Sequence, residues 1–224
     1  MKKLIHDNSL SIVFFSLFAI TLVGQVLFGI QEHNKELMDA GSTSESLSQY
    51  LTSGHFIQST FENFESEFLQ MGIFVWFTIF LRQKGSSESK SCDEPEEVDR
   101  EPSPLRKDAP WAVRKGGIWL AIYKHSLTLA LLLLFLISFI LHIYGSMKDE
   151  NFKNSLVGKP LIGYGEYLTS SRLWFESLQN WQSEFLSVLT IVVLSIFLRQ
   201  KGSPQSKPVD AANDETGEGG VRCN

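Results

Sequence analysis

Residues 50–90 read YLTSGHFIQSTFENFESEFLQMGIFVWFTIFLRQKGSSESK, and residues 167–207 read YLTSSRLWFESLQNWQSEFLSVLTIVVLSIFLRQKGSPQSK. The two stretches align without a gap at an offset of 117 residues, and 20 of their 41 positions are identical. Each contains a long uncharged apolar segment of a kind that is unusual on the surface of a soluble domain. The chain is therefore expected to be a duplicated membrane protein.

Four apolar segments predict membrane-spanning helices. Residues 10–30 and 126–147 are each long enough to cross a hydrocarbon core, which needs about 20 apolar residues. Residues 68–81 and 185–198 have 14 uncharged residues each, and as helices they reach only about 21 Å. They become spans if each helix begins a few turns earlier, near the N-cap candidates Thr52-Ser53 and Thr169-Ser170. An interfacial or re-entrant helix is the alternative.

The repeat extends to the first span, because Ser9 falls on Ser126 and Asn34 falls on Asn151 at the same offset. This match argues against a cleaved signal peptide at the start of the chain. The predicted fold class is an all-α integral membrane protein with four transmembrane helices, formed by two tandem parallel helical-hairpin repeats at an offset of 117 residues.

The predicted domain boundaries follow from the repeat and from composition. Residues 1–90 form a first two-span repeat, and residues 113–207 form a second. Between them, residues 91–112 form an acidic linker with prolines, and residues 208–224 form a tail that is expected to be disordered. The serine- and acid-rich stretch from residue 86 to residue 110, which begins in the first repeat and includes most of the linker, is expected to be fully solvated.

The distribution of Lys and Arg predicts the orientation. Two precede the first span, one lies between the first and second spans, nine lie in residues 82–124, four in residues 148–172 and four after residue 198. The positive-inside rule then places both termini and the central linker in the cytoplasm, and residues 31–60 and 148–172 outside. The two cysteines, Cys92 and Cys223, are expected to be reduced and without a structural role.

Several function classes find no support in the sequence. The formal charge of −5 and the absence of a basic patch exclude a nucleic-acid partner. The chain has no phosphate-binding loop, zinc-protease motif or nucleophile elbow, so no catalytic residue, no cofactor and no enzyme activity are predicted. No metal ligand is predicted either, because His6, His33, His55 and His125 are scattered and expected at the surface.

Polar side chains recur on one face of the second and fourth spans. Asn63 and Glu67 are four residues apart, and Asn180 and Glu184 repeat that spacing, which keeps each pair on one helix face. The predicted polar layer near the outer leaflet contains Gln25, Asn63, Glu67, His142, Asn180 and Glu184. Such a layer either joins the helices by hydrogen bonds or binds a proton, a cation or a small polar solute.

Basic and aromatic side chains flank the spans on the predicted cytoplasmic side. The predicted membrane-interface anchors are Arg82, Lys84, Trp111, Trp119, Arg199 and Lys201. Arg and Lys are expected to satisfy the negative helix ends and lipid phosphates, while Gly85 and Gly202 are expected to end the helices. Docking of a cytoplasmic partner on these ends is the alternative.

The segments Asn63–Leu69 and Asn180–Leu186, the two Leu-Arg-Gln-Lys-Gly-Ser ends and Asp108–Trp111 resemble a family of duplicated bacterial transmembrane proteins catalogued as a domain of unknown function. The resemblance covers nearly the whole chain and implies a multi-pass protein of the bacterial inner membrane. It implies no activity, cofactor or catalytic residue. The two copies are no longer equivalent, because Phe64-Glu65 stands where the second copy has Trp181-Gln182.

The expected function is that of a non-enzymatic membrane component, structural or partner-binding, in contact with the lipid bilayer. A homodimer or another membrane protein is the expected protein partner. The alternative is a small oligomeric transporter or channel that handles a proton, a cation or a small polar solute through Glu67 and Glu184; a membrane enzyme ranks third. A transporter predicts a solvated cavity lined by both glutamates.

Overall fold

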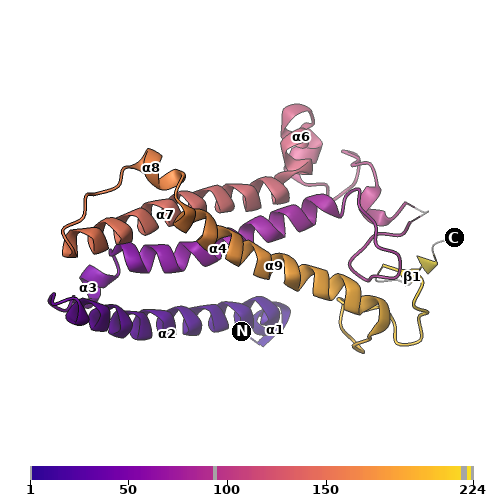
Figure 1. Ribbon diagram of the computed structural model, residues 1–224. Helices are drawn as coiled ribbons and strands as arrows, with labels where there is room; N and C mark the ends of the chain where they lie inside the picture. Colours follow the sequence, from indigo (N-terminus) through magenta and orange to yellow (C-terminus); the bar gives the residue numbers. More distant parts are fainter. Residues whose placement is uncertain (1, 93–94, 218–220, 223–224) are drawn as a thin grey trace. The chain divides into compact units, whose positions relative to one another are not determined.

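The computed structural model describes residues 2–92, 95–217 and 221–222 of the 224-residue chain. It is mostly helical, as predicted. In chain order (Figure 1) the elements are α1 (Lys2–Asp7), α2 (Ser9–Asp39), α3 (Leu47–Tyr50), α4 (Gly54–Phe77), the 3₁₀ helix η1 (Glu97–Asp99), α5 (Trp111–Lys115), α6 (Gly117–Lys124), α7 (Ser126–Leu156), α8 (Tyr164–Leu168), α9 (Ser171–Phe197), β1 (Glu215–Thr216) and β2 (Val221–Arg222).

The chain divides into two compact units. Unit 1 consists of Met1–Glu62 and Phe139–Leu173, and unit 2 consists of Asn63–Ser138 and Trp174–Asn224. Unit 1 contains both segments that the charge distribution predicts to lie outside.

The long helices that lie 117 positions apart begin at equivalent residues. Helices α2 and α7 are both 31 residues long and begin at Ser9 and Ser126. Helices α4 and α9 begin at Gly54 and Ser171, as expected from the Thr-Ser pair before each of them. The equivalent segments of the chain therefore take the same local structure.

Two asparagines of unit 1 fix the loops that follow α2 and α7. The side-chain amide of Asn34 donates to the carbonyl oxygen of Glu45 at 3.0 Å, and its oxygen accepts from the backbone N–H of Glu45 at 2.7 Å. Asn151 and Ile162 make the same two bonds at 3.0 and 2.6 Å. Each asparagine satisfies two backbone groups that a loop would otherwise leave to water.

Serine caps begin α4 and α9. The hydroxyl of Ser53 accepts from the backbone N–H of Phe56 at 3.2 Å, and that of Ser170 accepts from Leu173 at 3.3 Å. These bonds satisfy N–H groups that have no partner within the first helical turn. The predicted starts of both helices are confirmed.

The ends of these helices differ from the prediction. Helices α4 and α9 end at Phe77 and Phe197. Gly85 and Gly202, which were expected to end them, lie farther along the chain in turns, with φ of 88° and 84°. The glycines are needed for the left-handed backbone of those turns and do not cap the helices.

Arg82 and Arg199 cover the open carbonyl groups at these helix ends. The acceptors are the carbonyl oxygens of Thr78, Ile79 and Leu81 for Arg82, and of Ser195, Ile196 and Leu198 for Arg199. A cation at the negative end of a helix is electrostatically favourable. Lys84 and Lys201 are exposed, and membrane anchoring by these four cations stays a prediction.

Helices α4 and α7 approach closely in unit 1 at two glycines. A Cβ atom added to Gly54 would lie 2.3 Å from the backbone nitrogen of Asp149, and one added to Gly145 would lie 2.5 Å from the backbone nitrogen of Gln58. The backbones thus leave no room for a side chain at either position. This contact places the first turn of α4 directly against α7.

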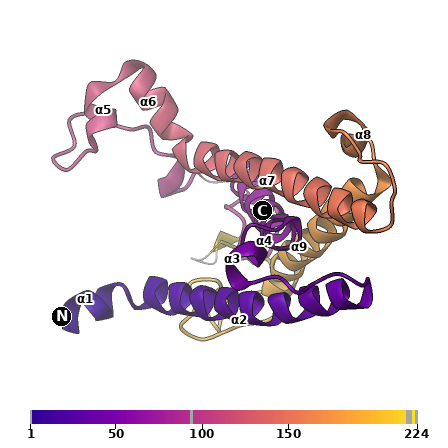
Figure 2. The same ribbon diagram turned by 90° about the vertical axis from the view of Figure 1, so that its left-hand side faces the viewer.

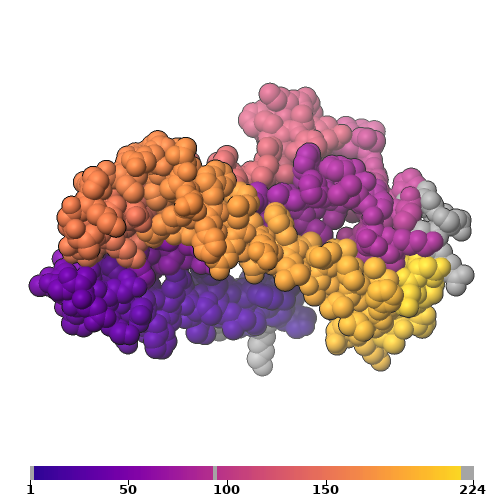
Figure 3. Space-filling model, viewed as in Figure 1, coloured from indigo at the N-terminus to yellow at the C-terminus, as the bar shows by residue number. Residues whose placement is uncertain are grey.

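Three of the described helices, α2, α7 and α9, are long and apolar enough to cross a membrane. Their apolar side chains are largely exposed, for example Phe15 at 71% and Phe175 at 67%. In the space-filling view, the side chains of α9 (orange) form an open surface (Figure 3). An apolar surface of this extent suits lipid better than water.

Helix α4, which contains most of the predicted second span, is not one of these three. It carries Glu62, Glu65 and Glu67 near its middle. Three carboxyl groups so close together lower the hydropathy of the helix below that of a typical span. The structure therefore supports three membrane-spanning helices, and a fourth span remains a prediction.

The linker and tail of unit 2 are less solvated than predicted. The hydroxyl groups of Ser86 and Ser195 are 2.9 Å apart, and the backbone N–H of Gly85 donates to the Thr216 hydroxyl at 2.8 Å. Lys207 is buried, which lowers its pKa, and its ammonium group donates to three backbone carbonyl oxygens. Full solvation is thus wrong for the segment that begins at Ser86, because its hydroxyl groups bond to protein.

Cys92 is disulfide-bonded, so the prediction of a reduced thiol is wrong for this residue. Cys223 lies outside the described residues. Two isolated cysteines have no recognisable spacing, and the sequence therefore gives no signal for pairing. A disulfide is typical of an oxidising compartment, whereas the charge distribution predicts a cytoplasmic linker.

A short helical pair, α5 and α6, precedes α7 in unit 2 (Figure 2). The ammonium group of Lys115 lies 4.7 Å from the ring centroids of both Trp111 and Trp119. The two tryptophans remain 60% and 45% exposed. An exposed aromatic pair beside a cation suits the headgroup level of a bilayer, and this predicted role remains untested.

Candidate metal centre

The six residues of the predicted polar layer are divided between the two units. In unit 1, the Gln25 amide donates to the hydroxyl groups of Ser59 and Thr60 at 3.4 and 3.2 Å, and His142 is completely buried. The other four, Asn63, Glu67, Asn180 and Glu184, belong to unit 2. A single layer of all six stays a prediction.

Within unit 2, the structure brings the two predicted glutamates together. The carboxyl groups of Glu67 and Glu184 interact directly. Glu67 is exposed and Glu184 is half-buried. Of the six predicted residues, the structure therefore places Glu67 and Glu184 close to each other.

Glu65 is a buried carboxyl group that the sequence interpretation missed. Its exposure is 0%, and its oxygen accepts from the indole N–H of Trp181 at 3.1 Å. The Trp181 ring in turn packs edge-on against Phe135 at 6.4 Å. The sequence contained one indication of this pair. Both Glu65 and Trp181 stand at positions where the two copies differ.

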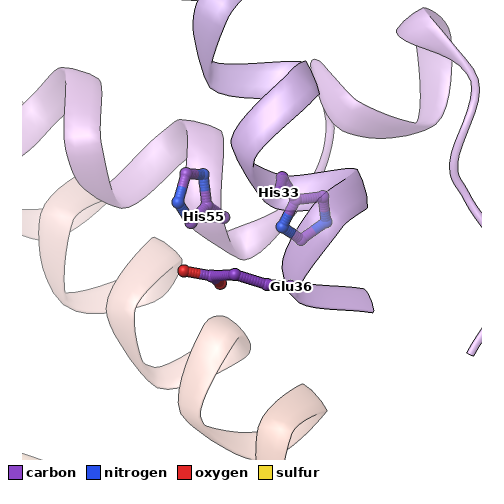
Figure 4. Close-up of side chains that lie close together, drawn as sticks. All are labelled: His33, Glu36 and His55. Atoms are coloured by element: carbon purple, nitrogen blue, oxygen red, sulfur yellow. The ribbon is translucent and has the colours of Figure 1, made fainter. Parts of the chain in front are cut away.

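Unit 1 contains a different cluster, formed by His33, Glu36 and His55. His33 and Glu36 are three residues apart on α2 and therefore share one helix face. His55 comes from the first turn of α4. One ligand atom of each residue lies within 4.8 Å of the others (Figure 4).

The His33 ring is enclosed by aromatic side chains. It is 3% exposed, and its centroid lies 5.5 Å from that of Tyr50 and 6.4 Å from that of Phe152. The His55 ring lies 5.0 Å from the His33 ring. This packing leaves the imidazole groups few orientations, so their nitrogen atoms are held in place.

The hydrogen bonding of His33 determines which of its nitrogens is available. Its Nε2 lies 3.3 Å from the Glu45 carboxylate, which accepts the N–H of that nitrogen. The lone pair of the neutral ring then lies on Nδ1. Among the described residues, the buried Nδ1 atoms of His33 and His55 have no hydrogen-bond partner. Metal-binding histidines typically have this arrangement, with the second ring nitrogen bound to a carboxylate.

The environment of His55 favours the protonation state that a metal requires. Desolvation lowers the pKa of His55, and the nearby carboxylate of Asp149 offsets this only in part. A neutral imidazole is the form that coordinates metals. The ring is therefore ready to bind near neutral pH.

A metal ion would need a modest contraction of the cluster. Tetrahedral zinc, with bonds of about 2.0–2.1 Å to nitrogen or oxygen, separates its ligand atoms by about 3.3 Å. The Glu36 side chain is 47% exposed and can rotate. Its carboxylate currently lies 3.8 Å from the ammonium group of Lys153.

The equivalent positions of the second copy carry charges of their own. At the offset of 117, His33, Glu36 and His55 correspond to Glu150, Lys153 and Arg172, which also lie in unit 1. The Arg172 guanidinium pairs with Glu150 and, at 2.8 Å, with Asp149, which also pairs with Lys153 at 3.1 Å. The second copy thus places a carboxylate and two cations, Lys153 and Arg172, where the first copy has two imidazoles and a carboxylate.

The expectation of surface histidines is wrong for His33, which is buried. The three-residue spacing of His33 and Glu36 could have indicated that both side chains lie on one helix face. The approach of His55 to His33 is a tertiary contact between α4 and α2, which no local pattern contains.

Comparison with curated proteins and with solved structures gave no match. A family model with the description "Domain of unknown function (DUF6766)" matches residues 1–218. This coverage agrees with the resemblance expected from the repeated motifs. The chain therefore belongs to the DUF6766 family, a family of unknown function.

Proposed function

We propose that this chain is an integral membrane protein that binds one divalent transition-metal ion through His33, Glu36 and His55, with zinc as the first candidate. The observation that carries the proposal is the pair of buried Nδ1 atoms, unpartnered among the described residues, beside a carboxylate. Two imidazoles and a carboxylate are ligands that suit zinc and related metals. Two of the three equivalent positions of the second copy carry cations, Lys153 and Arg172, which supports a cation here.

The proposed architecture has four membrane spans in two tandem parallel repeats, with α4 as the second span. Three apolar helices, the matched bounds of α2 and α7, and the matched asparagine bonds support it. The glutamates of α4 would then face protein instead of lipid.

The proposed location is the bacterial inner membrane, with both termini in the cytoplasm. The Lys and Arg distribution supports this orientation. Residues 31–60 and 148–172, and hence the metal centre, would lie outside. Labelling of Cys92 tests the orientation. After mild reduction, a membrane-impermeant maleimide added to intact cells should label Cys92 only if the linker is outside.

The proposed role is non-enzymatic. The metal centre would either hold the outer loops in a conformation that binds a partner or store a metal ion for delivery. Lipid is the proposed partner of the exposed apolar surfaces of α2, α7 and α9. A second copy or another membrane protein is the proposed protein partner.

A second candidate function is transport of a proton or a small cation. The direct interaction of Glu67 and Glu184 in unit 2 favours it. Reconstituted vesicles would show proton or cation uptake that the double variant Glu67→Gln/Glu184→Gln abolishes. Equal uptake with and without the glutamates would exclude this pathway.

Metal binding is tested on the full chain in detergent micelles after treatment with a chelator. Zinc affinity is measured by competition with a chromophoric chelator, and stoichiometry by elemental analysis. The wild type should bind one ion per chain, and His33→Gln or His55→Gln should each weaken binding by more than about 100-fold, because each removes a direct ligand. His125→Gln is the matched control, since His125 is an exposed histidine outside the cluster.

A charge-swapped variant separates loss of metal from loss of fold. The triple change His33→Glu, Glu36→Lys and His55→Arg gives the first copy the residues of the second. It should bind no zinc, and helical circular dichroism beside the wild type shows whether the fold is kept. Equal zinc affinity in the wild type and this variant would refute the site.

A further inference from the structure

We infer that the metal centre has one exchangeable coordination position, which opens into a cavity of unit 1 and accepts a small anion. This inference rests on the proposed metal site. Three protein ligands leave the fourth position of a tetrahedral ion open, as in metal sites that bind water or substrate. The geometry around the cluster shows what faces that position.

The cavity has a volume of about 230 Å³. Its walls include both histidines, Glu45, Thr52, Lys148 and Asp149, all in unit 1. Pockets for drug-sized ligands measure about 300–1,000 Å³. The space therefore suits water and a ligand of a few atoms.

Asp149 provides an acceptor for a group bound in this cavity. It is 1% exposed, and its Oδ2 is paired with Arg172 and Lys153. Its Oδ1 is buried and has no hydrogen-bond partner in the described part of the chain. Buried carboxylate oxygens are almost always hydrogen-bonded. A water molecule or protonated ligand on the metal would donate to Oδ1.

The charge of the cluster favours an anion once the metal is bound. The carboxylates are those of Glu36, Glu45, Asp149 and Glu150, and the cations are those of Lys148, Lys153 and Arg172. Four negative and three positive groups give a net charge of −1, which attracts a cation. A divalent metal changes the sum to +1, so the loaded site attracts an anion.

Lys148 is the cation best placed to hold that anion. It is exposed, and its ammonium group donates to the backbone carbonyl of Thr52, another residue of the cavity wall, at 2.6 Å. Lys148 is not one of the three proposed metal ligands. Its removal should therefore weaken anion binding without weakening metal binding.

The test uses the full chain in detergent, loaded with Co²⁺, and titrates azide while recording the visible absorption spectrum. The expected result is a saturable spectral change in the wild type. In Lys148→Gln, azide binding should be about fivefold weaker, because one nearby positive charge is lost, while Co²⁺ binding should not be weakened. Lys159→Gln, which removes an exposed lysine outside the cavity, should behave as the wild type.

Two results overturn the inference in different ways. If Co²⁺ binds but azide leaves its spectrum unchanged, the site is closed, with Asp149 as a fourth protein ligand, and the proposed metal function survives. If neither Co²⁺ nor zinc binds, the metal centre itself is refuted and the open position with it. Equal azide affinity in the wild type and Lys148→Gln would remove Lys148 from the anion site.

Discussion

Replacing Gly145 by alanine should destabilise the protein, because α4 and α7 meet there through their backbones. The added Cβ would lie 2.5 Å from the Gln58 nitrogen, 2.8 Å from Cγ2 of Ile57 and 2.9 Å from the Ile57 carbonyl carbon. Two of these atoms are backbone atoms that no side-chain rotation can move. Overpacking of this kind costs about 1–3 kcal/mol.

The matched control is Gly24→Ala, because Gly24 is also a helical glycine but a Cβ there meets no atom within 4 Å. Alanine is intrinsically better than glycine in a helix by about 1 kcal/mol, and this gain is common to both variants. The difference between them is therefore the overpacking term of about 1–3 kcal/mol. At roughly 2–4 °C per kcal/mol, Gly145→Ala should unfold about 2–12 °C below Gly24→Ala.

The assay is thermal unfolding in detergent, followed by helical circular dichroism for both variants and the wild type. Gly145→Ala should also weaken zinc binding, because the ligand His55 follows Gly54 in the turn of α4 that packs against α7. Equal melting temperatures for Gly145→Ala and Gly24→Ala would refute the close approach of the two helices.

Three further outcomes are expected. Glu45→Gln should weaken zinc binding by about 10- to 100-fold, measured by chelator competition, because it removes the group that orients His33. Trp181→Phe should lower the free energy of unfolding by about 1–3 kcal/mol in detergent denaturation, because buried Glu65 loses an N–H donor; an unchanged value would contradict a structural role for this bond. The folded state lowers the pKa of His55 below its ordinary value of 6.5, so the unfolded chain binds the proton more strongly. Metal-free protein should therefore have its full stability above about pH 6.5 and lose stability as the pH falls through 6.5 toward the folded-state pKa. His55→Gln should flatten this part of the curve of melting temperature against pH, and an identical slope would show that His55 is not the group responsible.

Features that depend on neighbouring residues could be predicted from the sequence. The caps at Ser53 and Ser170 follow from side chains within three positions of the N–H groups that they bind. The long apolar runs in α2 and α7 indicate span-length helices without further information. The repeat could be recognised because 20 of the 41 aligned residues are identical.

Features that depend on tertiary contact could not be predicted in this way. His33 is buried because Tyr50, Phe152 and His55 surround it, and these three residues come from three different helices of unit 1, α3, α7 and α4. Ser86 is buried because it meets Ser195, 109 residues away. Composition indicated solvation there, since it counts polar groups but not the partners they find.

The short distance between Lys153 and Glu36 makes metal binding a competition. Lys153 is shared between Glu36 at 3.8 Å and Asp149 at 3.1 Å. A metal ion that takes the Glu36 carboxylate releases Lys153 to Asp149, so occupancy of the site on α2 changes the ion pairs on α7. By thermodynamic reciprocity, any partner that holds Lys153 away from Glu36 raises the metal affinity by the same factor with which metal promotes that partner's binding. The Lys153 ammonium group would then compete with the metal ion for the Glu36 carboxylate. A residue on α7 would thereby regulate the metal affinity of ligands on α2 and α4.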